Sequence, residues 1–384
     1  MIEDMLTNRK IRVLVVDDTI VYRKAVSDIM EELPEVELVG VAHNGKIAMA
    51  KIATLKPDLL TLDIEMPEMN GLEVLEALQK QHLGIGAIML STLTADGSEM
   101  TMRALELGAF DFILKPQSKN LTEGKNEIKR LIHPMIQAFA RSKVALTLLG
   151  KNAPITTQRP VLRKIGLGTG STPAQKTQPA SRPTSSSARR GKSEIVTIGI
   201  STGGPNALTQ MLPKLPADLG VPVLIVQHMP PIFTKSLAQS LDKKCALSIK
   251  EAEDGESLKE NVVYIAPGGK QMRLKASSDG KNRLIKITND PPENSCKPSV
   301  DYLFRSVGDY YVGRTTAVIM TGMGSDGTKG LETLKNKGSF IIAQSEETCV
   351  VYGMPKAPIE AGLVDVVAPL EKIADEIVKS VRFF

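Results

Sequence analysis

The sequence has 384 residues, of which 42% are hydrophobic and 24% charged, as in ordinary globular proteins. A chain of this length exceeds one ordinary core, so we expect two domains. Cys245, Cys296 and Cys349 form no CxxC pair, which argues against a zinc site or a disulfide framework and favours a reducing compartment, the cytoplasm. The N-terminal MIEDMLTNRK lacks the apolar segment of a signal peptide, and no apolar run reaches the roughly 18 residues of a membrane span, so we expect no membrane insertion.

The net charge of +5 is concentrated in one segment. Residues 151–192 contain nine Lys or Arg and no Asp or Glu, which leaves a net charge of −4 (5 − 9) for the rest of the chain. A nucleic-acid-binding domain places its positive charge on a folded face. This distribution therefore disfavours nucleic acid as a partner.

Strands alternate with helices in the N-terminal half. Short apolar runs predict strands at 11–16, 36–41, 59–64, 87–90 and 109–114. Helical patterns fill the intervals, at 21–30, 45–55, 72–78 and 100–107, and a last helix is predicted at 126–142. Alternation at this spacing predicts βαβ units and a doubly wound parallel sheet.

Polar side chains stand at the carboxyl ends of these strands, where such sheets bind ligands. They are Asp17, Asp18, Asp63, Thr92 and Lys115. Three carboxylates in one crevice repel one another without a divalent cation, and oxygen-only ligands favour Mg²⁺. The lysine and the hydroxyl suit a phosphoryl oxygen. Each residue alone is equally well explained as a helix cap, but five at successive strand ends favour a site.

Residues 10–140 resemble the receiver domain of bacterial two-component response regulators. The resemblance rests on Val-Val-Asp17-Asp18, on Leu-Asp63-Ile-Glu-Met-Pro-Glu-Met-Asn-Gly, on Thr92, and on Lys115-Pro116. It implies transient phosphorylation of Asp63 with bound Mg²⁺, a switch through Thr92 and Lys115, and a histidine kinase as phosphodonor. The family's switch aromatic lies in the last strand, which points to Phe110.

Residues 151–193 contain five prolines, many Ser and Thr, and no aromatic residue. Such a segment buries too little apolar surface to fold alone, and we expect a flexible tether. The alternative is that its basic character docks it on an acidic partner or a membrane surface. The expected organisation is a receiver domain at 10–142, a linker at 143–193 and a catalytic domain at 194–384.

The C-terminal half restarts the alternation. Strands are predicted at 195–200, 221–226, 262–266, 315–320 and 340–343, and helices at 205–211, 233–241, 300–307 and 370–381. Two short runs, 272–274 and 284–287, predict a hairpin that covers one edge. The fold class is therefore α/β, with a second doubly wound, Rossmann-like domain.

Ser201 ends the first of these strands and precedes Thr202-Gly203-Gly204-Pro205, a tight turn that opens a helix. We interpret it as a nucleophile, although Gly199-x-Ser201-x-Gly203 also resembles a degraded dinucleotide-binding loop without the acidic ribose ligand. His228 is the one histidine of this half, and it is either the base that activates Ser201 or a loop histidine without a role. Asp326, in a Gly-rich turn, orients His228, caps the next helix, or does both.

From residue 193 onward the chain resembles the catalytic domain of bacterial chemotaxis protein-glutamate methylesterases. The matching motifs are Gly-Ile-Ser201-Thr-Gly-Gly-Pro, Gln-His228-Met-Pro, Tyr-Ile-Ala-Pro-Gly-Gly and Thr-Gly-Met323-Gly-Ser-Asp326-Gly. The resemblance implies nucleophile Ser201, base His228 and orienting Asp326, with the Met323 N–H and nearby Thr202 assisting the oxyanion and no cofactor for hydrolysis.

The two resemblances together imply a phosphorylation-activated hydrolase for sensory adaptation. Its substrates would be glutamate γ-methyl esters, and also glutamines, of methyl-accepting chemotaxis receptors, and its phosphodonor a chemotaxis histidine kinase. In the unphosphorylated state we expect the receiver to cover the Ser201 face. The alternatives are a DNA-binding response regulator, which would need a basic recognition domain, and a non-catalytic adaptor.

Overall fold

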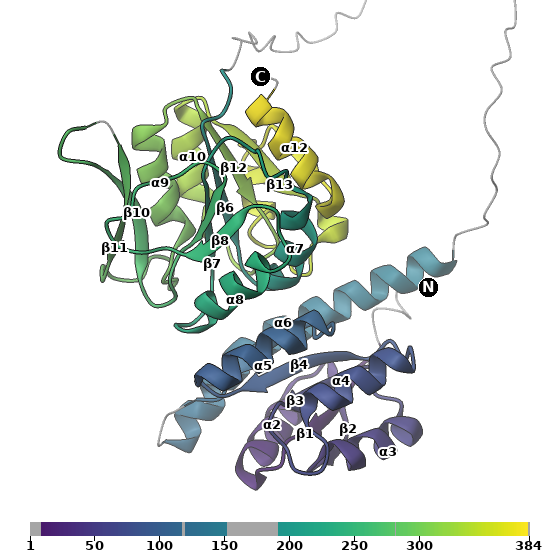
Figure 1. Ribbon diagram of the computed structural model, residues 1–384. Helices are drawn as coiled ribbons and strands as arrows, with labels where there is room; N and C mark the ends of the chain where they lie inside the picture. Colours follow the sequence, from purple (N-terminus) through teal and green to yellow (C-terminus); the bar gives the residue numbers. More distant parts are fainter. Residues whose placement is uncertain (1–8, 117–119, 152–190, 281, 383–384) are drawn as a thin grey trace, which may run out of the picture.

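The computed structural model describes residues 9–116, 120–151, 191–280 and 282–382, with no side chains described for residue 121 or residues 142–151. Each half of the chain forms its own α/β unit (Figure 1). Within the described ranges, no helix combines the length and apolar character needed to cross a membrane.

The N-terminal unit has a five-stranded parallel sheet in the order β2-β1-β3-β4-β5. Its strands are β1 (Ile11–Val16), β2 (Val36–Ala42), β3 (Leu59–Asp63), β4 (Gly86–Ser91) and β5 (Asp111–Leu114). Its helices are α2 (Ile20–Glu32), α3 (Gly45–Leu55), α4 (Gly71–Lys80), α5 (Ala95–Glu106) and α6 (Leu121–Lys151). The expected doubly wound receiver fold is confirmed.

The C-terminal unit has a seven-stranded parallel sheet in the order β14-β13-β12-β6-β7-β9-β8. Its strands are β6 (Ile195–Ile200), β7 (Val223–Gln227), β8 (Ser248–Glu251), β9 (Val262–Ile265), β12 (Thr315–Ile319), β13 (Phe340–Gln344) and β14 (Val366–Ala368). Its helices are α7 (Gly204–Met211), α8 (Phe233–Asp242), α9 (Val300–Tyr310), α10 (Thr328–Asn336), α11 (Lys356–Glu360) and α12 (Leu370–Arg382). The expected hairpin is a separate two-stranded sheet, β10 (Gln271–Ala276) with β11 (Arg283–Thr288).

Three short elements were not expected from the sequence: the edge strands β8 and β14, and helix α11. Edge strands pair on one side only, so they need neither the length nor the apolar and β-branched composition of the fully buried strands β6 and β12. The last helix of the receiver half, α6, is longer than expected, because it runs from Leu121 to Lys151 and the sequence predicted 126–142. Most of the expected linker, residues 152–190, lies outside the described residues.

The two units contact each other through α5 and β5 on one side and α7 and α8 on the other (Figure 1). Phe112 of β5 stacks on Phe233 of α8, with ring centroids 4.9 Å apart. Glu106, at the end of α5, accepts hydrogen bonds from Ser240 Oγ at 2.6 Å and Lys244 Nζ at 2.5 Å. One buried apolar cluster extends from the receiver half into the catalytic half, so the contact is a packed interface.

Candidate active site and phosphorylation site

Ser201 lies in the turn between β6 and α7, as the sequence predicts. Its N–H donates to Thr321 O at 2.9 Å, and its carbonyl accepts from Gly204 N at 2.7 Å. Gly203 has a φ of 74°, which favours glycine, and a Cβ at Gly204 would lie 2.0 Å from Gln227 Oε1. The glycines therefore let the backbone turn tightly enough to hold Ser201 beside the end of β7.

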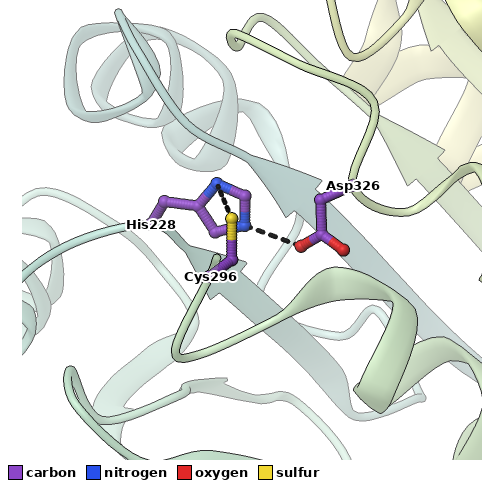
Figure 2. A group of neighbouring side chains, drawn as sticks. All are labelled: His228, Cys296 and Asp326. Atoms are coloured by element: carbon purple, nitrogen blue, oxygen red, sulfur yellow. Dashed lines mark hydrogen bonds and ion pairs between the residues drawn. The ribbon is translucent and has the colours of Figure 1, made fainter. Parts of the chain in front are cut away.

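His228 directly follows β7, the strand next to β6. The parallel register pairs Ile200 with Gln227, and His228 N donates to Ile200 O at 3.1 Å. His228 Nε2 lies 2.9 Å from Asp326 Oδ2, as Figure 2 shows. Adjacent strand ends thus bring His228 to Ser201, and the loop after β12 brings Asp326 to His228.

Asp326 is buried, with 3% of its surface exposed, at the N-terminus of α9. Its carboxylate accepts from the backbone N–H of Val300 at 2.7 Å and from Ser299 Oγ at 2.9 Å. The expectation that Asp326 caps the next helix is wrong, because that helix, α10, has Gly327 at its N-cap without a side-chain hydrogen bond. Asp326 instead caps α9, which is earlier in the chain and close only in the folded molecule.

Asp326 and His228 stabilise each other's charged forms. Burial raises the pKa of the Asp326 carboxyl. The hydrogen bond with His228 and the positive charge of its ring outweigh this effect, together with hydrogen bonds from donors such as Val300 N–H, and lower the pKa to about 2. Burial lowers the pKa of His228, but its hydrogen bond with Asp326 and the nearby Cys296 raise it to about 9. The site therefore stabilises an imidazolium, the form that a general base takes after it accepts a proton.

A cavity of about 570 Å³ joins the expected catalytic residues. Ser201, Thr202, His228 and Met323 all line it. The Ser201 hydroxyl makes no hydrogen bond with any described residue, so the Ser201–His228 contact of a closed triad is not formed here. Such contacts commonly tighten only when substrate binds. The N–H groups of Thr202 and Met323 likewise have no hydrogen-bond acceptor among the described residues.

Residues of the receiver half complete the wall of this cavity. Asp111 Oδ2, at the start of β5, accepts a hydrogen bond of 3.2 Å from the backbone N–H of Gly203. Asn206 Nδ2 of α7 donates to Ala109 O at 3.0 Å. Burial raises the pKa of Asp111 to about 6, against the opposing effect of hydrogen bonds from the Phe112 and Gly203 N–H groups. The receiver therefore places a carboxylate against the turn that carries Ser201.

The predicted phosphorylation site assembles at the carboxyl ends of β1, β3 and β5. Lys115 Nζ lies 2.7 Å from Asp63 Oδ2 and 3.0 Å from Asp17 Oδ2. Ligand oxygens of Asp17, Asp18 and Asp63 lie within 4.8 Å of one another. Asp17 Oδ2 is buried and lacks a well-aligned hydrogen bond although it is ion-paired with Lys115. Three clustered carboxylates, one of which has a buried oxygen without a hydrogen bond, fit a Mg²⁺ ion.

The electrostatics of Asp63 follow from its burial, which raises its pKa to about 6 despite the opposing attraction of Lys115. The neighbouring carboxylates Asp17 and Asp18 raise it further. A bound divalent cation would neutralise this repulsion and favour ionised Asp63. The Thr92 hydroxyl lies 3.3 Å from Thr94 Oγ1, so it points along its own loop.

The aromatic residue of this segment that contacts the catalytic half is Phe112, and the role of Phe110 as switch aromatic stays a prediction. Phe110 packs edge-to-face on Phe139 of α6, within the receiver half, with centroids 5.5 Å apart. Phe110 precedes β5 and packs against the receiver cluster that contains Ile113 and Phe139, whereas Phe112 belongs to the cluster that continues into the catalytic half. That difference in packing is a tertiary feature that the sequence does not encode locally.

Sequence reasoning missed three further polar residues of the site: Asp111, Asn294 and Cys296. Asn294 Nδ2 donates to Asp326 Oδ1 at 2.9 Å, and Cys296 Sγ lies 3.8 Å from His228 Nδ1. Asn294 and Cys296 precede α9 and carry no catalytic motif. The surrounding stretch, residues 289–299, is polar and Pro-rich, so the sequence offered no signal that distinguished these two residues.

Comparisons with known proteins match both halves of the chain. Residues 196–377 match the CheB methylesterase family model, and residues 13–124 match the response regulator receiver domain model. A protein-glutamate methylesterase/protein-glutamine glutaminase of Desulfotalea psychrophila is 58% identical over 379 residues, covering 98% of this chain and 100% of that protein. Proteins of the same name from Geobacillus kaustophilus and Bacillus subtilis are 44% and 43% identical, each across 97% of this chain and 99% of the relative.

Proposed function

The chain belongs to the family of protein-glutamate methylesterases/protein-glutamine glutaminases, and on that premise we propose that Ser201 is its nucleophile, His228 its general base and Asp326 the carboxylate that orients His228. As a member of this family it is a hydrolase in which a receiver domain governs a methylesterase domain. The observation that carries the residue assignment is the His228 Nε2–Asp326 Oδ2 distance of 2.9 Å, at the strand end beside Ser201.

In the proposed reaction, Ser201 Oγ attacks the γ-carbonyl carbon of a methylated glutamate. Because His228 Nε2 is engaged by Asp326, the proton of Ser201 passes to Nδ1. The N–H groups of Met323 and Thr202 stabilise the tetrahedral oxyanion, each by about 3 kcal/mol. His228 then protonates the departing methoxide, which leaves as methanol, and water releases the glutamate from Ser201. A glutamine side chain loses ammonia by the same steps.

A Ser201→Ala variant tests the assignment. With a small phosphodonor present, we expect methanol release from methylated receptor to fall by at least about 10³-fold, as is usual when a hydrolase loses its nucleophile. Ser248→Ala, on the exposed edge strand β8, is the matched control and should keep full activity. Full-rate methanol release by Ser201→Ala would overturn the assignment.

We propose that the unphosphorylated receiver inhibits the enzyme by covering the cavity beside Ser201. Asp111 and the Phe112–Phe233 stack are the supporting contacts. Asp17, Asp18 and Asp63 would hold Mg²⁺, which when bound shields the charge of the incoming phosphoryl group. Phosphorylation of Asp63 would draw the Thr92 hydroxyl inward, shift β5 and weaken the interface. Full-length enzyme as active without phosphodonor as with it would refute the inhibition.

The proposed substrates are methyl-accepting chemotaxis receptors, and the proposed phosphodonor is a chemotaxis histidine kinase, both met in the cytoplasm. The cavity supports a protruding side chain as substrate, because Met323 at its rim is 44% exposed. The hydrolysis requires no cofactor in this scheme, since the proposed proton transfers use His228. Methanol release from receptor-containing membranes, measured with and without kinase and ATP, tests both partners.

A further inference from the structure

Residues 293–296 form a tight turn just before α9. Glu293 N donates to Cys296 O at 3.1 Å, and Cys296 N donates to Glu293 O at 2.7 Å. The two central residues are both left-handed, with φ of 50° at Asn294 and 62° at Ser295. This pattern matches a type I′ turn, in which asparagine is favoured at the first central position and a non-glycine residue at the second is strained.

Other elements of the catalytic half fix this turn in place. The Glu293 carboxylate accepts two hydrogen bonds from Arg305 Nη2 of α9, at 2.6 and 2.7 Å. Gln271 Nε2, at the start of β10, donates to Cys296 O at 3.3 Å. The strained turn is therefore held from both sides, which is the situation in which local strain marks a function.

The amide of Asn294 lies between two buried carboxylates. Its Nδ2 donates to Asp326 Oδ1 at 2.9 Å and to Asp301 Oδ2 at 2.8 Å, and these two aspartates are 3% and 2% exposed. Two buried carboxylates repel each other, and a shared donor reduces that repulsion and fixes their relative position. Asn294 thus holds Asp326 where it meets His228.

Cys296, at the other end of the turn, lies against the histidine. Its Sγ is 3.8 Å from His228 Nδ1, and in the view of Figure 2 the sulfur overlies the imidazole ring. Cys296, His228 and Asp326 are close enough to hold a metal ion, but Asp326 already accepts hydrogen bonds from Asn294, Ser299 and Val300. The arrangement therefore suits a support for the ring better than a metal site.

We propose that the turn 293–296 is a positioning element for hydrolysis, in which Asn294 fixes Asp326 and Cys296 fixes the His228 ring. With both contacts in place, Nε2 faces Asp326, and the long Sγ–Nδ1 contact holds the ring until Ser201 replaces the thiol at Nδ1. This inference rests on the proposed role of His228 as general base. Asn294 acts through Asp326 and Cys296 acts through the His228 ring, so both are positioning residues.

The first test removes the Asn294 amide without disturbing the turn. Asn294→Gly keeps a residue suited to left-handed φ, and Asn261→Gly is its matched control. Asn261 is also left-handed, with φ 63°, and its Oδ1 accepts one hydrogen bond, from Gly220 N at 2.6 Å. In full-length enzyme with phosphodonor, we expect kcat of Asn294→Gly to fall about tenfold with KM within about twofold of wild type. Asn261→Gly should keep wild-type kcat.

The second test removes the thiol. We expect Cys296→Ala to lower kcat and to move the acid limb of the kcat/KM profile to lower pH, because Cys296 contributes to the raised pKa of His228. Cys245→Ala, with a half-buried thiol in the packing around α8, is the control and should leave the profile unchanged. Melting temperatures of all four variants separate this effect from loss of folded protein.

The outcomes distinguish this inference from the proposed function. If Asn294→Gly matches Asn261→Gly in kcat, or Cys296→Ala keeps the wild-type pH profile, the positioning role is wrong. In that case, loss of activity in a His228→Ala variant would still support the proposed triad. If His228→Ala itself retains full methanol release, the proposed function fails first.

Discussion

Asp111 of the receiver half accepts a hydrogen bond from Gly203 N–H, two residues beyond Ser201, at an Oδ2–N distance of 3.2 Å. Helix α7 begins at the same turn, so a carboxylate from the receiver half lies at the N-terminus of a helix in the catalytic half. The contact links domain packing directly to the active-site turn.

Replacing Asp111 should therefore activate the unphosphorylated enzyme. We expect Asp111→Ala to weaken docking by about 1–3 kcal/mol, since Gly203 N–H loses its acceptor, and to raise methanol release without phosphodonor several-fold. Asp28→Ala, on the outer helix α2, is the control and should leave the basal rate low. Equal basal rates for the two variants would remove Asp111 from the inhibitory contact.

The same residue gives docking a pH dependence. The pKa of docked Asp111 is raised from 3.8 to about 6, so protonation favours docking: this stabilisation is fully present below about pH 4 and lost as pH rises through about 6. The ratio of basal rates of wild type and Asp111→Asn isolates the effect, because asparagine does not titrate. A ratio that stays constant from pH 4 to 7 would contradict it.

The aromatic stack across the interface should contribute independently. Phe112→Ala removes the partner of Phe233 and should raise basal activity, since such pairs add about 0.5–1.5 kcal/mol beyond burial. Phe110→Ala is matched in chemistry but loses a contact within the receiver, with Phe139. It should lower the melting temperature without raising basal methanol release. Similar activation by both variants would mean that general loosening of the receiver suffices.

The raised pKa of His228 predicts the pH profile of the activated enzyme. A general base must be unprotonated, so kcat/KM should decline as pH falls through a pKa above the ordinary 6.5. Asp326→Asn removes the charge that stabilises the imidazolium and should shift this limb to lower pH. It should also lower kcat, by up to about 10⁴-fold. Asp309→Asn, paired with Lys337 on the surface, is the control and should leave the limb in place.

Activation should require both Asp63 and a divalent cation. Asp63→Asn, or chelation of Mg²⁺ with EDTA, should abolish stimulation by a small phosphodonor while leaving basal methanol release unchanged. Glu65→Gln, an exposed carboxylate two residues on, should still be stimulated. Stimulation that survives chelation would mean that the three carboxylates work without a metal.

Much of the fold followed from local pattern. Buried strands such as β6 and β12 are rich in apolar and β-branched residues, and Ser201 follows β6 before a glycine turn, so the strand, the turn and the helix could all be predicted. The clustering of the receiver carboxylates could be predicted equally well, because parallel strands present their carboxyl ends at one edge of the sheet. The edge strands β8 and β14 escaped prediction because pairing on one side imposes no such pattern.

The sequence by itself determined the two α/β units and the candidate residues Ser201, His228 and Asp63, because each of these residues stands at the carboxyl end of a strand that the sequence pattern predicts. Only the tertiary structure decided what surrounds them. Asp326 caps α9 instead of the helix that follows it, and Asp111 reaches Gly203 from 92 residues away. These contacts join segments that share no local pattern, and they form only when separate elements pack together.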